Sequence, residues 1–303
     1  MTAIPLRIGY VPEHFSTPLY FAQHYFGLVA TLVPFPSGTG HMITSLRSGE
    51  IDLGIGLTEG WITGLGQKKD PNTGETLDTE AGYSLVGTFV DSPLCWAIST
   101  GINRDDITSI QDLKGSKIGV SRMGSGSHIM GFVLADQHGW LDPGTQPFSL
   151  HPLQTFAKLR EGVSNKTADF FMWEYFTSKR YYSASASPHP IKQVGEIYTP
   201  WPSWHIVAAD PKDSRLEDFF VRLDQGIEYF QGHQNESATY ISQNLDYEDE
   251  DARSWLETVR FTKGTKGVSR KVVDHTIEVL VKAGVLADVP SPSTGMIGLV
   301  RDE

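Results

Sequence analysis

The sequence predicts an α/β protein built on mostly parallel sheets. The first observation is a repeated order of a short β-branched apolar run, a turn rich in Gly, Ser or Pro, and an amphipathic stretch. The second is that such a series occurs twice and is followed by a helical C-terminal third. The third is the length of 303 residues with 39% hydrophobic composition, which is sufficient for about two packed domains.

The first series occupies the N-terminal third. It predicts helices over residues 19–27 and 40–49, which end in glycine-containing turns. A polar stretch over residues 68–82 is expected to be a surface loop. Apolar runs predict strands over residues 6–11, 30–35, 51–57, 84–90 and 94–100.

The second series predicts strands over residues 117–121, 147–153, 168–175 and 191–198, and helices over 128–140 and 155–166. A Pro/Trp-rich segment then leads to helices over residues 214–233, 236–245, 249–261 and 269–285. The two series could form consecutive domains, or the C-terminal part could return to the first domain. Periodicity alone leaves both arrangements open.

Composition excludes several classes of function. A net charge of −11 and a pI near 5.4 provide no basic field for nucleic acid or anionic lipid. The lone Cys95 excludes an internal disulfide or a multi-cysteine metal site. No H-E-x-x-H pattern, P-loop or G-x-G-x-x-G fingerprint is present, so we expect no metal and no cofactor.

No window has the ~18 apolar residues that a membrane span requires. The N-terminus moves directly into an alternating strand pattern, without a basic n-region or an apolar h-region. As written, the chain is expected to be cytoplasmic, and it would be periplasmic if a signal peptide had been removed.

Two loops have residues suited to holding an anion. The stretch "SRMGSGSHIM" begins at Ser121 and places Ser125 and Ser127 between a predicted strand and a predicted helix. The stretch "PSGTGHM" has the same chemistry, with Ser37 and Thr39 between glycines. Glycine turns and the free N–H groups of a first helical turn favour a negative charge. The alternative is that these residues are simply good N-caps.

Neither loop carries a catalytic serine motif. Met123 and Ser125 stand two residues before the candidate serines, so the G-x-S-x-G pattern of a nucleophile elbow is absent. Trp173 and Glu174 end a predicted strand, where ligands of open α/β sheets bind. Taken singly, each tryptophan is better explained as cover for a core edge, whereas Glu174 needs a polar partner.

Four ordered blocks carry a family resemblance: "GYVPEHFSTPLYFAQHYFGL", "SGTGHMITSLRSGEIDLGIGLTEG", "SIQDLKGSKIGVSRMGSGSHIM" and "ADFFMWEYF". In order and spacing the chain resembles the type II periplasmic substrate-binding proteins of the nitrate/sulfonate/taurine and thiamine-precursor (NMT1/THI5-like) group. The resemblance covers about residues 6–210 and is strongest at "DLKGSKIGVSR" with the following "GSGSH", and at "SLRSGEIDLGIG".

The resemblance implies a two-lobed α/β fold, in which each lobe is a mostly parallel sheet flanked by helices and a ligand cleft lies at a two-strand hinge. Residues 1–94 plus 207–303 would form the first, interrupted lobe, and residues 95–206 would form the second. Strand crossovers near 92–97 and 204–208 would be the hinge.

The resemblance also implies ligand-binding residues in both lobes. The first lobe would contribute Glu13, His14, Gly38, Thr39, Gly40, Thr58 and Glu59, and the second would contribute Ser125, Gly126, Ser127, Trp173 and Glu174. Trp173 and Trp204 would cover an apolar or aromatic body, and the acidic side chains and His14 would suit a cationic or hydrogen-bond-donating part.

The expected function is the binding of a small anionic or zwitterionic organic metabolite with hinge closure. The alternative is a cytoplasmic enzyme on the same fold, similar to thiamine-pyrimidine synthases or dehydratases, in which Glu174 or His14 would be the general acid or base. The cysteine-rich motif of those synthases is absent. The expected partner is a small molecule, with a transport permease only if the native protein is exported.

Overall fold

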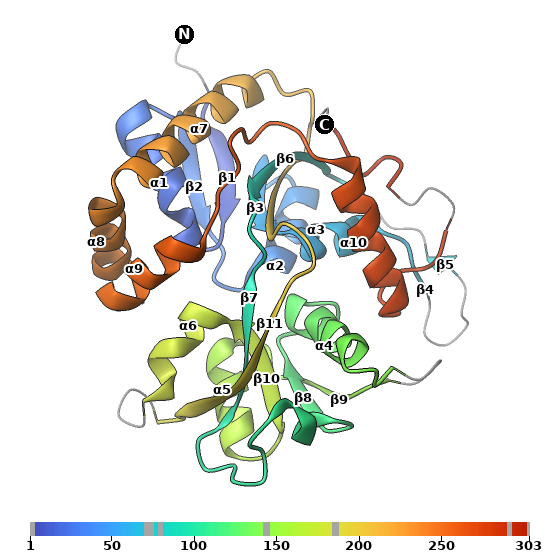
Figure 1. Cartoon of the computed structure of the whole chain (residues 1–303). Helices are drawn as coiled ribbons and strands as arrows, with labels where there is room; N and C mark the ends of the chain where they lie inside the picture. The colour runs from blue at the N-terminus through green and yellow to red at the C-terminus, as the bar shows by residue number, and fades with distance from the viewer. Residues whose placement is uncertain are drawn as a thin grey trace. The chain divides into compact units, whose positions relative to one another are not determined.

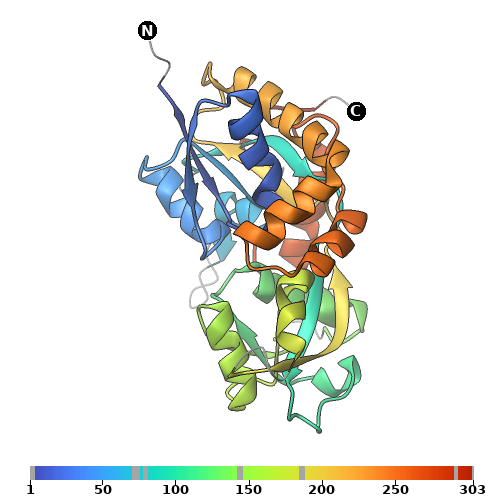
Figure 2. The same cartoon turned by 90° about the vertical axis from the view of Figure 1, so that its left-hand side faces the viewer.

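The computed structural model describes residues 4–69, 76–77, 81–141, 146–183, 188–289 and 293–301. The chain divides into two compact units, one of residues 1–93 with 201–303 and the other of residues 94–200. The first unit is therefore interrupted in sequence by the second. We describe each unit by itself (Figures 1 and 2).

The sheet of the first unit has five strands in the order β2-β1-β3-β12-β6. Strands β1, β2 and β3 are parallel, and β12 runs antiparallel to both β3 and β6. Four strands thus share one direction, as expected for a mostly parallel sheet. The bounds are β1 (Leu6–Tyr10), β2 (Ala30–Pro34), β3 (Leu53–Leu57), β6 (Ser84–Val90) and β12 (Trp204–Ala208).

Strand β12 explains why the division differs from the sequence-based one. The division implied by the family resemblance assigned residues 201–206 to the second unit. Trp204, however, pairs with Leu57 of β3 and with Val90 of β6, in the middle of the first sheet. The boundary between the units therefore falls at Pro200 and Trp201, before this strand.

Helices flank both faces of the first sheet (Figure 2). Right-handed crossovers from β1 to β2 and from β2 to β3 move in opposite directions, which places α1 (Thr17–Phe26) and α2 (Thr39–Arg47) on opposite faces. Helix α1 has Pro18 in its first turn and ends at Gly27, whose φ of 70° suits glycine. Helix α3 (Thr58–Leu65), which follows β3, was not predicted from the sequence.

The C-terminal third forms the four expected helices, all in the first unit. Helix α7 packs against α1 so closely that a Cβ on Gly226 would lie 2.3 Å from the carbonyl oxygen of Pro18. Helix α10 buries Val273, Ile277 and Leu280 on the single face that the sequence predicted. The bounds are α7 (Leu216–Gly232), α8 (Gln234–Asn244), α9 (Asp249–Thr258) and α10 (Arg270–Lys282).

The expected surface loop over residues 68–82 contains one short antiparallel pair, β4 (Lys68–Lys69) with β5 (Thr76–Leu77). Residues 70–75 and 78–80 of that loop lie outside the described residues. No helix among the described residues combines the length and the apolar character needed to cross a membrane.

The second unit repeats the design of the first. Its sheet has the order β11-β7-β10-β8-β9, and β7 alone runs antiparallel to its neighbours. The two mixed sheets flanked by helices confirm the predicted α/β fold class. The bounds are β7 (Cys95–Gly101), β8 (Lys117–Val120), β9 (Ser149–Pro152), β10 (Phe170–Glu174) and β11 (Ile191–Tyr198).

Two helices of the second unit follow the same crossover rule and lie on opposite faces of its sheet. They are α4 (Gly126–Gln137) and α5 (Phe156–Ser164). Short helical segments follow other strands, namely η2 (Ile110–Leu113), α6 (Tyr175–Lys179) and η3 (Arg180–Tyr182) in this unit and η1 (His14–Ser16) in the first.

The strand directions of each sheet determine where the candidate site lies. In each unit the strands that share a direction end at one edge of the sheet, and the antiparallel strand begins there. We call these the first edge and the second edge. Ligands of open α/β sheets bind at such carboxyl ends.

Candidate functional site

The first edge gathers every residue that the sequence predicted for the first lobe. Glu13 and His14 follow β1, Gly38 to Gly40 follow β2, and Thr58 and Glu59 follow β3. Trp204 begins β12 directly opposite Leu57, the last residue of β3. Sequence-distant residues are therefore neighbours along this edge.

The Gly38–Thr39 turn is fixed by the protein itself. Gly38 has φ 78° and ψ −167°, a conformation that requires glycine, and it is the N-cap of α2. The buried Thr39 hydroxyl accepts a hydrogen bond from the Leu57 N–H at 3.0 Å. Gly40 is half-buried in the first turn. The Thr39 hydroxyl therefore joins the start of α2 to the end of β3.

Thr58 and Glu59 hold the segment that enters the first unit after residue 200. The Thr58 hydroxyl donates to the Pro202 carbonyl at 2.5 Å, and the Thr58 N–H donates to the Ser203 carbonyl at 3.1 Å. The Trp201 indole N–H donates to Glu59 Oε2 at 3.0 Å. Three consecutive residues of this segment are thus attached to the start of α3.

Glu59 is a fully buried carboxyl group. Burial raises its pKa from 4.5 to about 7, although its own backbone N–H and the Trp201 indole act in the opposite direction. Its second oxygen, Oε1, is buried and has no hydrogen-bond partner among the described residues. A carboxyl group with an open acceptor position therefore lies at the first edge.

His14 and Trp204 lie within an aromatic cluster. The His14 ring is fully buried, stacks on Tyr247 at 4.4 Å between centroids and lies 4.1 Å from Trp255. Trp204 packs against Phe15 at 5.0 Å between ring centroids and is almost fully buried. Glu13 is half-buried, and its carbonyl oxygen accepts hydrogen bonds from the Ser16 N–H and hydroxyl. These side chains form the apolar part of the first edge.

The second edge contains the loop of residues 121–125, which connects β8 to α4 and which we call the serine loop. Ser125 is the N-cap of α4, yet its hydroxyl bonds the Ser127 hydroxyl at 2.9 Å instead of capping the helix. Ser127 Oγ also accepts from the Ser121 N–H at 3.2 Å. The first intrahelical hydrogen bond runs from the Ile129 N–H to the Ser125 carbonyl. The N–H groups of the residues before Ile129 in the first turn therefore have no acceptor within the helix.

His128 extends the donor set of this loop. Its Nδ1 accepts a hydrogen bond from the Gly124 N–H at 2.9 Å, so the neutral ring carries its proton on Nε2. Burial lowers the His128 pKa to about 4, which keeps the ring neutral. Only 8% of the residue is exposed, and Nε2 has no partner among the described residues.

Arg122 lies in the same loop and is not among the site residues predicted from the sequence. It is half-buried, and no hydrogen bond or ion pair of its side chain is present in the described part of the chain. Burial lowers the pKa of its guanidinium group, because the charge has lost part of its water without gaining a partner. The feature of the sequence that could have indicated Arg122 is an arginine in a Ser/Gly loop, directly after the strand predicted over residues 117–121.

Glu174 and Trp173 have roles that the fold explains. Glu174 Oε2 accepts from the Thr177 N–H at 2.6 Å and caps α6, which supplies the polar partner that the sequence required. Trp173 is half-buried, stacks on Phe156 at 5.1 Å and packs against the core of the second unit. Trp96, the cross-strand partner of Glu174, has a buried indole N–H without a partner in the described residues.

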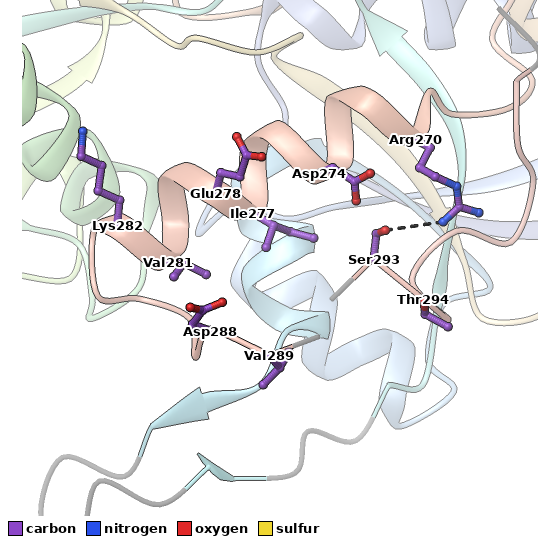
Figure 3. Close-up of a pocket in the computed structure, with 10 residues that line it drawn as sticks. All are labelled: Arg270, Asp274, Ile277, Glu278, Val281, Lys282, Asp288, Val289, Ser293 and Thr294. Carbon is purple, nitrogen blue, oxygen red and sulfur yellow. Dashed lines mark hydrogen bonds between the residues drawn. The ribbon is translucent and has the colours of Figure 1, made fainter. Parts of the chain in front are cut away.

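A groove of about 690 Å³ lies along α10 (Figure 3). None of the residues predicted from the sequence lines it. Asp274, Glu278 and Lys282 of α10 line one side of the groove, and Asp288, Val289, Ser293 and Thr294 line the other. Among the described residues, no group of three or more His, Cys, Asp or Glu side chains is arranged to hold a metal ion.

Comparison with known proteins identifies the class and then the family. The chain resembles the alkanesulfonate-binding proteins SsuA of Escherichia coli (19% identity, 94% of this chain and 89% of that one, TM-score 0.65) and of Xanthomonas axonopodis pv. citri, bound to MOPS (17%, 94% and 96%, 0.68). These identities indicate the fold alone. The molecule has the type II periplasmic binding protein fold, which confirms the resemblance seen in the sequence.

The family follows from a higher similarity. The Candida albicans CA3427 gene product, which defines a family with the generic periplasmic binding protein fold, is 38% identical over 99% of both chains, with a TM-score of 0.83. A model of the Ca3427-like binding proteins matches residues 96–197. The chain belongs to the Ca3427-like family. Comparison with curated proteins gave no match.

Proposed function

We propose that this protein binds a small anionic or zwitterionic organic metabolite through its two edges, and that binding is accompanied by hinge closure. The coarser statement, a binding-protein fold suited to small-molecule ligands, follows from the fold itself. The ligand class rests on the polar groups at the edges, and the closure is the motion by which such two-unit proteins respond to ligands.

The observation that carries the proposal is the position of buried polar atoms without partners in the described residues. Glu59 Oε1 and Trp204 Nε1 lie at the first edge, and Trp96 Nε1 and His128 Nε2 lie at the second. Buried polar groups in native proteins are nearly always hydrogen-bonded, because an unmade bond costs about 1 to 3 kcal/mol. A polar ligand at these edges would supply the missing bonds.

The chemistry of the two edges differs. The second edge offers donors: the first turn of α4, the serine hydroxyls, Trp96 and His128. The first edge offers the Glu59 carboxyl oxygen as an acceptor, beside an aromatic cluster. This combination suits an organic molecule with an acidic group at one end and a hydrogen-bond donor or amine at the other.

The test is thermal melting of the full chain against a panel of carboxylates, sulfonates, phosphates, amines and pyrimidines. A ligand at 100 times its Kd should stabilise the fold by about 2.7 kcal/mol. We expect stabilisation by compounds that combine an acidic group with a donor, and recovery of each hit unchanged. Stabilisation by none of these classes would contradict the proposal.

One observation favours a second candidate, acid–base catalysis at the first edge. A buried carboxyl group whose pKa is about 7, such as Glu59, is suited to proton transfer near neutral pH. The sequence had proposed Glu174 or His14 for this role, but Glu174 caps a helix and His14 lies between aromatic rings. Mass spectrometry of the recovered ligand separates the two functions, because an enzyme would consume it.

A further inference from the structure

The serine loop of the second edge contains a cation that has no counter-charge among the residues that the structure describes. Arg122 follows β8 after one intervening residue, Ser121, and its guanidinium group forms neither a hydrogen bond nor an ion pair among the described residues. The protein carries a net charge of −11, so acidic side chains are abundant elsewhere. A partly desolvated cation without a partner costs free energy, which an anion bound at the loop would recover.

Two further groups in the same loop point to a ligand. His128 Nε2–H is a buried donor without a partner in the described residues, while Nδ1 is fixed on Gly124. The first turn of α4 adds backbone N–H groups and the positive end of the helix dipole. Arg122, His128 and the first turn of α4 therefore all offer hydrogen-bond donors.

The charge of this edge limits which anion it suits. Arg122 is the cation of the serine loop, and His128 is neutral because of its burial. The carboxylate of Glu174 lies at the same edge, at the end of β10. Within the described residues of the serine loop, a doubly charged group would therefore meet Arg122 as its cation, and it would meet Glu174 of the same edge as a like charge. A protonated phosphate would in addition need an acceptor for its own hydroxyl, and the unpartnered groups of the loop are donors.

We infer that Arg122 is the specificity-determining counter-charge for the ligand's acidic group, and that the loop prefers a singly charged, fully deprotonated oxyanion, a carboxylate or a sulfonate, over a phosphate or phosphonate. This inference rests on the proposed function and specifies its ligand class. Arg122 pairs with the oxyanion, and His128 and the first turn of α4 donate to its oxygens.

The experiment uses two matched triplets, in which a carboxylate, a sulfonate and a phosphonate share one body. The bodies are 2-aminoethyl and benzyl. Affinities are measured by calorimetric titration at about pH 8.5, where the phosphonate carries two charges. We expect a carboxylate or a sulfonate to bind at least about tenfold more tightly than its phosphonate counterpart, which is about 1.4 kcal/mol.

Variants of the full chain test the residue. Arg122→Met should weaken binding of the preferred anion at least about tenfold. Arg122→Lys should retain part of the affinity, because the charge remains. Lys114→Met removes an exposed cation at the opposite end of β8 and should leave affinity unchanged. Melting of the unliganded Arg122→Met protein should show an intact fold, since that side chain has no partner in the part of the chain that the structure describes.

The outcomes are distinct. Equal or tighter binding of the phosphonates, or affinity within about twofold of wild type in Arg122→Met, would overturn the inference while leaving the proposed function in place. Binding by no member of either triplet, together with no hit in the thermal panel, would overturn the proposed function itself.

Discussion

Trp201 donates its indole N–H to Glu59 Oε2 at 3.0 Å. Trp201 is the first residue of the segment that returns to the first unit after residue 200, which we call the returning segment, and the bond joins it to the start of α3. Both side chains are almost fully buried. The carboxyl group that carries this bond has a raised pKa and an open second oxygen. One residue thus contributes to the attachment of the returning segment and to the polar chemistry of the first edge.

Replacement of Glu59 by Gln should change how stability depends on pH. Because the folded pKa, about 7, lies above the unfolded value of 4.5, the protonated form stabilises the fold. This contribution is complete below pH 4.5 and is lost as the pH rises to about 7, by on the order of 3 kcal/mol in the wild type. Glu59→Gln should lack that decline and be the more stable protein at pH 8.

Urea unfolding of wild type and Glu59→Gln from pH 4 to pH 8 measures this difference. Glu228→Gln, a change on the exposed side of α7, is the matched control and should follow the wild type. Parallel curves for wild type and Glu59→Gln would show that Glu59 does not titrate in this window.

Trp201→Phe should lower stability by about 1 to 3 kcal/mol, because it removes a donor to a buried carboxyl group. The loss should be larger above pH 7, where the carboxylate is charged, than at pH 4.5. Chemical unfolding at both pH values measures it, with the half-buried Trp140→Phe as a control. An equal loss at both pH values would mean that the effect is packing alone.

Gly60→Ala should destabilise the first edge. A Cβ at this position would lie 2.9 Å from Thr39 Cγ2 and 3.0 Å from Thr39 Cβ, so the hydrogen bond from Leu57 to Thr39 would be disturbed. We expect a loss of about 1 to 3 kcal/mol. Gly232→Ala, which has open space around it in α7, should instead be neutral or stabilising by up to about 1 kcal/mol. Similar effects in both variants would contradict the close contact.

His128 should remain neutral throughout the physiological range. Burial lowers its folded pKa to about 4 from 6.5, so its contribution to stability is present above pH 6.5 and is lost as the pH falls to about 4. Nitrogen NMR should show one tautomer, with the proton on Nε2, from pH 8 down to pH 5. A titration of the His128 ring near pH 6.5 would contradict the buried environment.

Sequence patterns predicted the strands and the long helices because apolar periodicity reports which face is buried. Helix α3 was missed because Gly60, Gly64 and β-branched residues have low helix propensity, and it forms because all eight of its residues are buried by the surrounding fold. The site was predicted only in part. The hydrogen bonds from Thr58 to Pro202 and from Trp201 to Glu59 join residues about 140 positions apart in sequence. Local sequence patterns do not encode such contacts.

The serine loop illustrates the same limit. Its position before α4 could be predicted from Gly and Ser in the sequence. The hydrogen bond between Ser125 and Ser127, and the lack of a partner for Arg122 among the described residues, depend on the folded surroundings. Charge and hydroxyl groups can be counted in a sequence. Whether each one is already occupied is a property of the structure.

The most direct test of the central claim is calorimetric titration of the full chain with the strongest compound from the panel, followed by mass spectrometry of the recovered compound. We predict saturable binding of a molecule that combines an oxyanion with a donor group, and recovery of that molecule intact. Binding of none of the tested classes would contradict the binding function, and conversion of the compound would show that the protein is an enzyme.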